Sequence, residues 1–322
     1  MNTIGKTATF AVGLALVFGA SLGIGHAVGP VGGESADAHA GHGMESSADP
    51  MGSGDTVPGG LQISEHGYTL VPPSEPLPAG KKTDFRFRIT GPDGKPVTRY
   101  TQSHGKDLHF IVARSDLSGF QHVHPELAAD GTWSVPLTFR SAGSYRVFTD
   151  FVPAGGSGLT LGADVSVAGD YRPTPLPAPS RTAHVDGYTV TLSGDATAGA
   201  ASMLTLSVAK DGRPVTDLQP YLGAYGHLVA LRQGDLAYLH VHPQGAPGDG
   251  TTRPGPGITF HAEFPSATAY RLYLDFQHQG KVHTAEFTVR AAASHGGSGT
   301  DTGSGSGSGS GADMPEHGGH DH

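Results

Sequence analysis

The 322-residue sequence contains no cysteine. This absence excludes a disulfide framework, thiolate chemistry, iron–sulfur clusters and cysteine-based zinc sites. The chain also lacks a basic stretch that could follow a phosphate backbone, and its formal net charge is −9 with histidine neutral. We therefore expect no nucleic acid among its partners.

The usual sequence motifs of enzymes are missing as well. The chain has no Gly-x-Ser-x-Gly elbow and no phosphate-binding loop, and no paired carboxylates stand out. We interpret the protein as non-enzymatic. A mononuclear copper or zinc enzyme with one open coordination position remains an alternative.

One segment alone is apolar enough to suggest a membrane or export signal. In residues 1–28, Lys6 precedes an uncharged run from Thr7 to about Gly25, and Gly25-His26-Ala27 has the small-x-small pattern of a cleavage site. The run is nearly long enough to span a bilayer, so a cleaved signal peptide and a retained membrane anchor are both open. Either one predicts an exported protein that is extracellular or on the outer face of the cytoplasmic membrane.

The two ends of the chain have little to bury. Residues 29–60 and 291–322 are dominated by small, polar and acidic residues, so burial cannot offset the entropy of ordering them, and we predict that both are disordered. They are interpreted either as solvated spacers or as flexible metal-collecting tails, since they carry His39, His42, Met44, His317, His320 and His322.

Between these ends the sequence repeats itself in one order, which indicates a duplicated domain. The matching stretches are His66–Leu70 with Asp186–Val190, Asp93–Thr98 with Asp211–Thr216, His109–Ala113 with His227–Leu231, His122–Pro125 with His240–Pro243, Tyr145–Phe151 with Tyr270–Phe276, and Ala163–Val167 with Ala285–Val289. The copies span 61–169 and 181–290, and a stiff proline-rich linker, 170–180, joins them.

Each copy shows short runs with strand-like patterns between turn signals. Residues 85–89 alternate apolar and polar side chains, and residues 91–94 read as a turn. No convincing helical periodicity occurs outside the N-terminal segment. The sequence thus predicts an all-β protein of two tandem immunoglobulin-like sandwiches, with a small closed barrel as the alternative for each copy.

The repeated His-Val-His-Pro motif is the strongest candidate for a functional site. Side chains two residues apart on a strand share one face, so His122 and His124 should project together. Pro125 cannot donate to a sheet ladder, which places the pair at a strand end or edge. His109 lies 13 residues before His122, as His227 lies 13 before His240, and antiparallel pairing of two adjacent strands would bring each third histidine close.

Clustered imidazoles favour a metal site over core histidines that serve packing alone. Asp150 and Asp275, at matched positions of a later strand, are expected as a fourth ligand or as acceptors that orient an imidazole. The predicted ligand sets are His109, His122, His124 and Asp150 in the first copy, and His227, His240, His242 and Asp275 in the second.

Nitrogen and carboxylate ligands suit Cu(II), with zinc as the alternative cofactor. A sulfur-rich Cu(I) site is disfavoured, since the two copies contain only Met203 and no cysteine. Several other histidines fall outside the pattern. His104 has no clear partner, His278 and His283 are expected to be exposed strand residues rather than extra ligands, and His184 and His261 are expected at the surface.

The His-Val-His-Pro motif, the Ala142–Val147 stretch, the His-containing linker and the N-terminal segment together resemble exported actinobacterial proteins of the YtkA-like or FixH-like type. That resemblance implies immunoglobulin-like modules associated with copper at the cell envelope. It also implies that the three histidines of each copy face the metal. Cupins and copper–zinc superoxide dismutase share a His-x-His element but need further ligands in an order that this sequence lacks.

We therefore expect an exported protein that binds or handles copper(II) or zinc at the envelope. The competing interpretation is a cell-surface scaffold or interaction module that holds no metal.

Overall fold

The computed structural model describes residues 57–239 and 241–294, and the side chain of His242 also falls outside the described part. The expected N-terminal signal or anchor and nearly all of both expected disordered ends therefore lie outside the described residues. The residues that are described form strands, turns and extended segments without an α-helix. Among them, no helix has the length and apolar character needed to cross a membrane.

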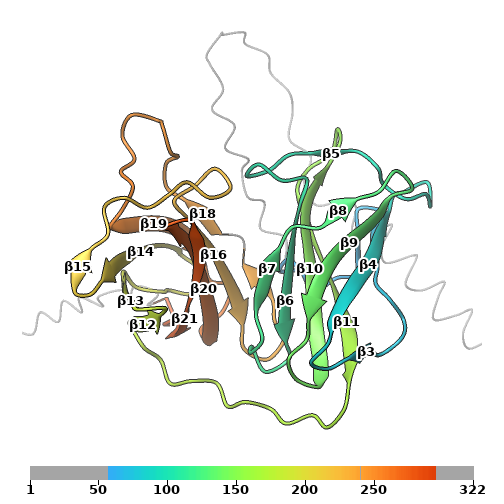
Figure 1. Ribbon diagram of the computed structural model, residues 1–322, viewed down its shortest axis with the longest axis horizontal. Coiled ribbons are helices and arrows are strands. Elements are labelled where there is room, and N and C mark those ends of the chain that lie inside the picture. The colour runs from blue at the N-terminus through green and yellow to red at the C-terminus, as the bar shows by residue number, and fades with distance from the viewer. Residues whose placement is uncertain (1–56, 240, 295–322) are drawn as a thin grey trace, which may run out of the picture. The chain divides into compact units, whose positions relative to one another are not determined.

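The first copy folds into two sheets (Figure 1). One sheet has the strand order β1 (Ser64–Glu65), β2 (Tyr68–Val71), β4 (Lys82–Thr90), β9 (Thr132–Thr138), β8 (Glu126–Leu127). The other has the order β3 (Leu77–Pro78), β11 (Leu159–Ala168), β10 (Gly143–Pro153), β6 (Leu108–Arg114), β7 (Gln121–Val123), and β5 (Tyr100–Thr101) also pairs with β10. The strand pairs are antiparallel except β3 with β11.

The second copy repeats this plan. Its first sheet has the order β12 (Thr182–Val185), β13 (Tyr188–Ser193), β14 (Ala201–Lys210), β19 (Gly257–Glu263), β18 (Val241–Pro243), and β15 (Arg213–Pro214) pairs with β14. Its second sheet has the order β17 (Tyr238–Leu239), β16 (Gly226–Arg232), β20 (Ala269–His278), β21 (Lys281–Arg290). The prediction of two tandem immunoglobulin-like sandwiches is confirmed. Neither copy is a closed barrel, because each has two separate sheets.

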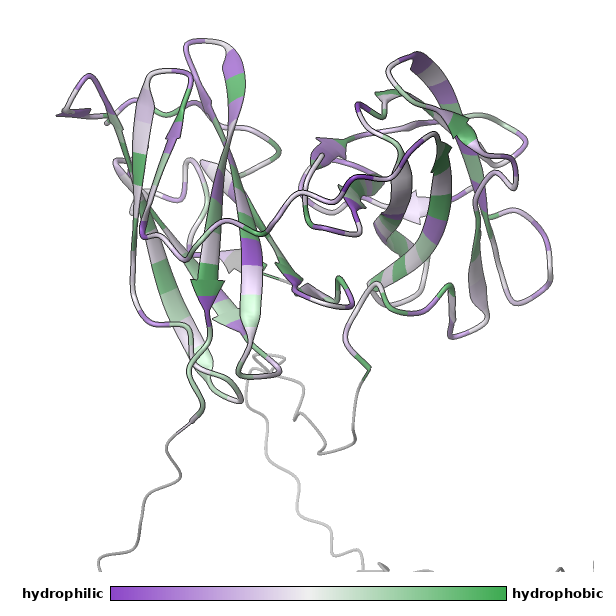
Figure 2. Ribbon diagram, turned by 90° about the horizontal axis from the view of Figure 1, so that it is seen from below, coloured by the Kyte–Doolittle hydropathy of each residue, from purple (hydrophilic) through white to green (hydrophobic). Residues whose placement is uncertain are grey.

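The core of each sandwich comes from alternate residues of its strands. On β4, Phe85, Phe87 and Ile89 are buried while the residues between them are exposed. The alternation is visible as changing hydropathy along the strands in Figure 2. Two separate core clusters result, one per copy, so each sandwich has the apolar interior that its strands require.

Each sandwich has a tyrosine at the start of a long strand whose hydroxyl is bonded to the preceding backbone. The Tyr145 hydroxyl donates to the carbonyl oxygen of Ser141 at 2.8 Å, and the Tyr270 hydroxyl donates to that of Ser266 at 2.9 Å. This hydrogen bond to the backbone four residues upstream is the tyrosine corner of immunoglobulin-like folds. Its presence in both copies supports both the fold and the duplication.

We expect the change Tyr145→Phe to lower the free energy of unfolding by about 1–2 kcal/mol, because the partly buried hydrogen bond to the Ser141 carbonyl is lost while the ring stays. Urea denaturation followed by fluorescence would measure this. The matched control is Tyr171→Phe, whose ring is 46% exposed and whose hydroxyl bonds only the Ser115 hydroxyl near the surface. A loss below about 0.5 kcal/mol is expected there, and equal losses in the two variants would contradict the role of the corner.

The two sandwiches pack against each other through the sheets that hold β6 and β16. They belong to one compact unit of the chain, residues 55–322. Every residue of β6 is buried, since one face covers its own core and the other covers the second sandwich. A third apolar cluster fills this interface and contains Ile111, Ala113, Leu117 and Phe148 from the first copy with Val229, Leu231, Leu236 and Tyr273 from the second.

Interface contacts are reciprocal, as expected when a duplicated domain packs on itself about a local two-fold axis. Phe120 stacks on Tyr273 with ring centroids 3.9 Å apart, and the matched pair Tyr238 and Phe148 has its centroids 5.7 Å apart. The Tyr273 hydroxyl also donates to the carbonyl of Leu117. The copies therefore form one structure rather than two domains held apart by a linker.

The folded part extends beyond the boundaries that composition suggested. Gly59 and Gly60, placed in the disordered 29–60 segment, are paired with the folded copies: the Tyr238 amide donates to the Gly59 carbonyl, and the Gly60 amide donates to that of Thr160. At the other end, the amide of Ala292 donates to the carbonyl of Ala196.

The linker 170–180 is anchored to the folded sandwiches at several points. The Thr174 amide donates to the Asp116 carboxylate, and Leu176 packs on the interface cluster. Composition could not reveal these contacts, because they depend on surfaces that only the folded sandwiches create.

Candidate metal site

Two neighbouring strands place three histidines of the first copy together. His109 lies on β6, and β7 pairs with β6 antiparallel, with His122 opposite Ile111. His124 follows β7 directly, so the pair sits at the end of an edge strand, as Pro125 required. The spacing of 13 residues thus produces the proximity that it predicted.

The facing nitrogens of these three rings are close enough for one ion. His109 Nδ1 lies 3.1 Å from His122 Nε2 and 3.2 Å from His124 Nε2. One nitrogen from each ring lies within 4.8 Å of the others. Zinc–nitrogen bonds of about 2.0–2.1 Å in a tetrahedral arrangement would place ligand nitrogens about 3.3 Å apart. The triad His109, His122 and His124 therefore has the dimensions of a metal site.

Hydrogen bonds on the far side of two rings fix which nitrogens face inward. His109 Nε2 lies 3.1 Å from the Ser103 carbonyl oxygen, an acceptor only, so this nitrogen carries the hydrogen. His122 Nδ1 lies 2.8 Å from a carboxylate oxygen of Asp275 and donates to it. In neutral rings, His109 Nδ1 and His122 Nε2 then face each other as two lone pairs, an arrangement that a metal ion between them would stabilise.

Burial disfavours protonation of these imidazoles. Burial lowers the pKa of His109 to about 3, and the neighbouring His122 lowers it further in the same direction. Burial likewise lowers the pKa of His124 to about 3, again with a contribution from His122. These rings are therefore neutral at physiological pH and available as metal ligands.

The carboxylate that orients His122 comes from the other sandwich. Asp275 lies on β20, and both side chains are only 5% exposed. Its second carboxylate oxygen accepts a hydrogen bond from the Thr284 hydroxyl at 2.6 Å. The sequence predicts that Asp275 serves the histidines of its own copy, and the structure corrects this: Asp275 orients a histidine of the first copy, because the two sheets that carry these residues face each other.

Asp150 occupies the matched position on β10. It is the cross-strand neighbour of His109, as Asp275 is of His227, and the Thr160 hydroxyl lies 3.4 Å from its carboxylate. Asp150 lines a cavity of about 40 Å³ beside the triad.

In the second copy, His227 is held as His109 is. Its Nε2 donates to the Tyr221 carbonyl at 2.8 Å, and burial lowers its pKa to about 4. Its ring centroid lies 6.2 Å from those of His109 and His122. The other two predicted ligands of this copy, His240 and the side chain of His242, lie outside the described residues, so the second triad stays a prediction.

Two histidines outside the motif differ from expectation. His278 and His283, expected to be exposed, are each 5% exposed. His278 Nδ1 lies 2.7 Å from the Tyr188 hydroxyl and its Nε2 3.1 Å from Asp217, while His283 Nδ1 lies 2.8 Å from Asp186. Strand alternation could have shown this, since His278 shares a face with the buried Leu274 and Phe276. His184 and His261 are exposed, as predicted.

Residues 63–169 and 183–293 both match the family described as Domain of unknown function (DUF8832). Together the matches cover more than half of the sequence, and the chain therefore belongs to this family, with the domain present in two copies. A comparison with curated protein sequences finds no match. The likeness to YtkA-like and FixH-like modules stays an expectation from the sequence.

The chain also matches several solved structures at low identity. Invasin, a bacterial integrin-binding protein, is 13% identical over 70% of this chain and 39% of its own, with a TM-score of 0.21. The Yersinia pseudotuberculosis adhesin InvE is 15% identical over 71% of this chain and 60% of its own, also with a TM-score of 0.21. Domains 4 and 5 of the S-layer protein SbsC are 10% identical over 72% of this chain and 100% of their own, with a TM-score of 0.21. The chain thus spans less than two thirds of the first two, and identities of this size say nothing about function.

Proposed function

We propose that the protein is an exported metal-binding protein that holds a Cu(II) ion, with zinc as the alternative, on His109, His122 and His124. One observation carries this proposal: His109 Nδ1 lies 3.1 Å from His122 Nε2 and 3.2 Å from His124 Nε2, while hydrogen bonds on the far side turn the lone pairs of His109 and His122 inward. Export is inferred from residues 1–28. The resemblance to copper-associated envelope modules agrees with both parts.

The donor set favours Cu(II) or Zn(II) over Cu(I). All three ligands are imidazoles, and the histidine–carboxylate pair formed by His122 and Asp275 is the arrangement that orients ligands at such metals. Met203 is the one methionine among the described residues, and it is 57% exposed on β14. No thioether thus lies at the triad, and among divalent ions Cu(II) has the highest intrinsic affinity for nitrogen ligands.

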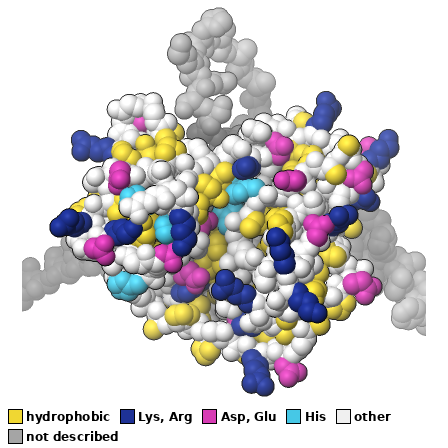
Figure 3. Space-filling view, in the orientation of Figure 1, with side chains coloured by type: hydrophobic (Ala, Val, Ile, Leu, Met, Phe, Trp, Pro, Cys, Tyr) yellow, Lys and Arg dark blue, Asp and Glu magenta, His cyan; other side chains and the backbone are white. Residues whose placement is uncertain are grey.

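Three protein ligands suit a protein that handles metal. A fourth coordination position stays available for water or for a ligand of another molecule. An ion held in this way can pass to an acceptor by ligand exchange without first returning to bulk water. Histidine side chains reach the surface on the face of the molecule shown in Figure 3.

The proposal is tested by titration with Cu(II) and Zn(II). The test uses the full chain with the histidines of its two ends changed to Asn, here called the end-substituted protein: His26, His39, His42, His295, His317, His320 and His322. We expect stoichiometry near two, one ion for the triad and one for the predicted second triad. In the Cu(II) form, electron paramagnetic resonance should show nitrogen ligands.

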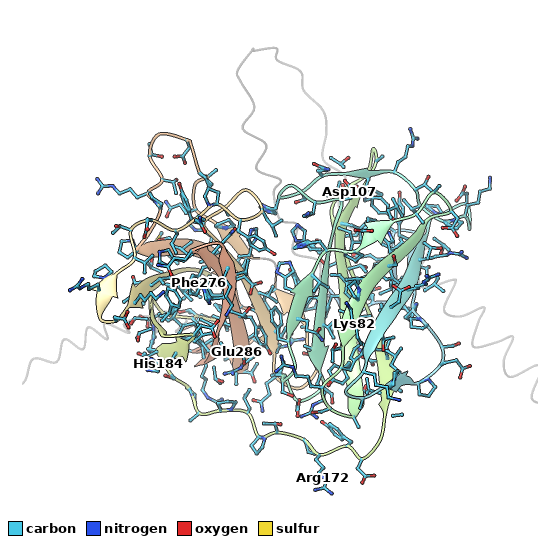
Figure 4. The ribbon with its side chains drawn as sticks, in the orientation of Figure 1. Lys82, Asp107, Arg172, His184, Phe276 and Glu286 are labelled. Atoms are coloured by element: carbon cyan, nitrogen blue, oxygen red, sulfur yellow. The ribbon has the colours of Figure 1, made fainter. Side chains whose placement is uncertain are left out.

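Two further variants assign the ion to the triad. His122→Ala with His124→Ala should remove one of the two ions, whereas His184→Ala, which changes an exposed histidine, should remove none (His184 is labelled in Figure 4). Uptake no greater than background would refute metal binding and leave the scaffold interpretation. Turnover of oxygen or superoxide by the loaded protein would favour the enzyme.

A further inference from the structure

One imidazole beside the triad lies at the surface. His104 is exposed in the turn before β6, three residues before Asp107, which Figure 4 labels. Its ring centroid is 6.1 Å from that of His109 and 5.6 Å from that of His227. His104 also lines the cavity of about 40 Å³ whose walls include His109 and His122. It therefore contacts both the solvent and the cavity next to the ligands.

The backbone of this turn does not require a histidine. Ser103 and Lys106 exchange both backbone hydrogen bonds, at 2.9 and 3.1 Å, and His104 has a φ of 51°, as in a two-residue hairpin turn. In the second copy Leu222 occupies the same place with a φ of 53°. Because leucine adopts the same conformation there, the geometry of the turn does not explain why a histidine occupies position 104.

The triad, in contrast, is hard to reach. His109 is 6% exposed and the His122 side chain 5%. A cavity of about 40 Å³ holds only a few water molecules. A hydrated ion must therefore lose most of its water before the buried nitrogens replace it.

We propose that His104 is the metal-exchange ligand of this site: it binds the ion from solvent and passes it to the triad, and takes it up again on release. The step is an exchange of ligands without a change of oxidation state, in which one imidazole nitrogen replaces a water molecule and is then replaced by triad nitrogens. The proposal rests on the proposed metal-binding function and adds the route of the metal.

Stopped-flow mixing of the end-substituted protein with Cu(II), and extraction of bound Cu(II) by excess EDTA, test this route. The variant His104→Leu copies the residue of the second copy. We expect it to slow both the association and the extraction of the triad ion by about tenfold. The dissociation constant should change by less than about threefold, because a ligand used only in transit alters both rates alike.

Two further variants separate ligand chemistry from turn geometry. His104→Asp keeps a metal ligand in a residue that tolerates the left-handed conformation and should restore most of the rate. His104→Asn tolerates the same conformation but is a weak ligand, and it should stay slow. Fast exchange in His104→Asn, or slow exchange in His104→Asp, would overturn the proposal.

The remaining outcomes are equally decisive. Unchanged rates in His104→Leu would overturn the exchange role while leaving the metal site intact. A loss of affinity with an unchanged association rate would make His104 a resident ligand and also overturn it. Absence of metal uptake by the end-substituted protein itself would refute the proposed function, and the exchange role with it.

Discussion

Changing Asp275 to Asn is expected to weaken metal binding at the triad about 10- to 100-fold, although Asp275 belongs to the other sandwich. Its carboxylate accepts the Nδ1–H of His122 at 2.8 Å, with both side chains 5% exposed. This bond holds the tautomer whose Nε2 faces the ion and raises the basicity of that nitrogen. An amide is uncharged and supports neither effect as well. Competition titration with a chelator of known affinity would measure the change.

The matched control is Asp186→Asn in the same sandwich. Asp186 also accepts a hydrogen bond from a buried histidine, His283, at 2.8 Å, but the ring of His283 packs on Tyr188 and Phe276, and Asp186 also accepts from Lys281. Its replacement should leave the affinity unchanged. Equal affinity in the two variants would show that the carboxylate of Asp275 does not orient a ligand.

The metal-free protein is expected to lose stability as the pH falls below about 6.5, the ordinary pKa of histidine. The folded-state pKa values of His109 and His124 are lowered to about 3 and that of His227 to about 4, chiefly by burial. Between these values and 6.5 the unfolded chain binds more protons than the folded one, so the free energy of unfolding decreases as the pH decreases.

The size of this loss of stability can be given for the buried ring of His109. For His109, the difference in proton binding between pH 6.5 and pH 5 corresponds to about 2 kcal/mol. His124 is half-buried, and solvent screening makes its contribution smaller. Urea denaturation of the end-substituted protein in EDTA, at a series of pH values between 7 and 4.5, would measure the slope.

The variant His109→Gln provides the comparison, since glutamine is polar and does not titrate. Its free energy of unfolding should depend less steeply on pH over the same interval, whatever its value at pH 7. The same slope in both proteins would mean that His109 is protonated in the folded state, contrary to the effect of its burial.

Local features of the site could be predicted because they depend on chain spacing and strand periodicity. His109, His122 and His124 lie on one hairpin, and the 13-residue interval with the His-x-His alternation is enough to bring their rings together. The repeat likewise revealed the duplication, and the strand patterns revealed the all-β class. The boundaries at Gly59 and Ala292 were missed, since glycine and alanine carry little signal of pairing.

The position of His104 could also be matched between the two copies. It stands five residues before His109, as Leu222 stands five residues before His227 in a turn of the same conformation, so the two turns could have been matched between the copies. What the sequence could not supply was the nearness of His104 to His227, which lies in the other sandwich.

The sequence by itself determined two copies of an immunoglobulin-like sandwich and a histidine triad within the first, because strand pairing inside a domain follows from alternation and turn spacing. The tertiary structure decided that the copies bury the outer faces of β6 and β16 against each other, and that Asp275 of one copy holds His122 of the other. Alternation shows which residues share a face of a strand. It does not show what covers the outer face, and at this site a second copy of the same fold covers it.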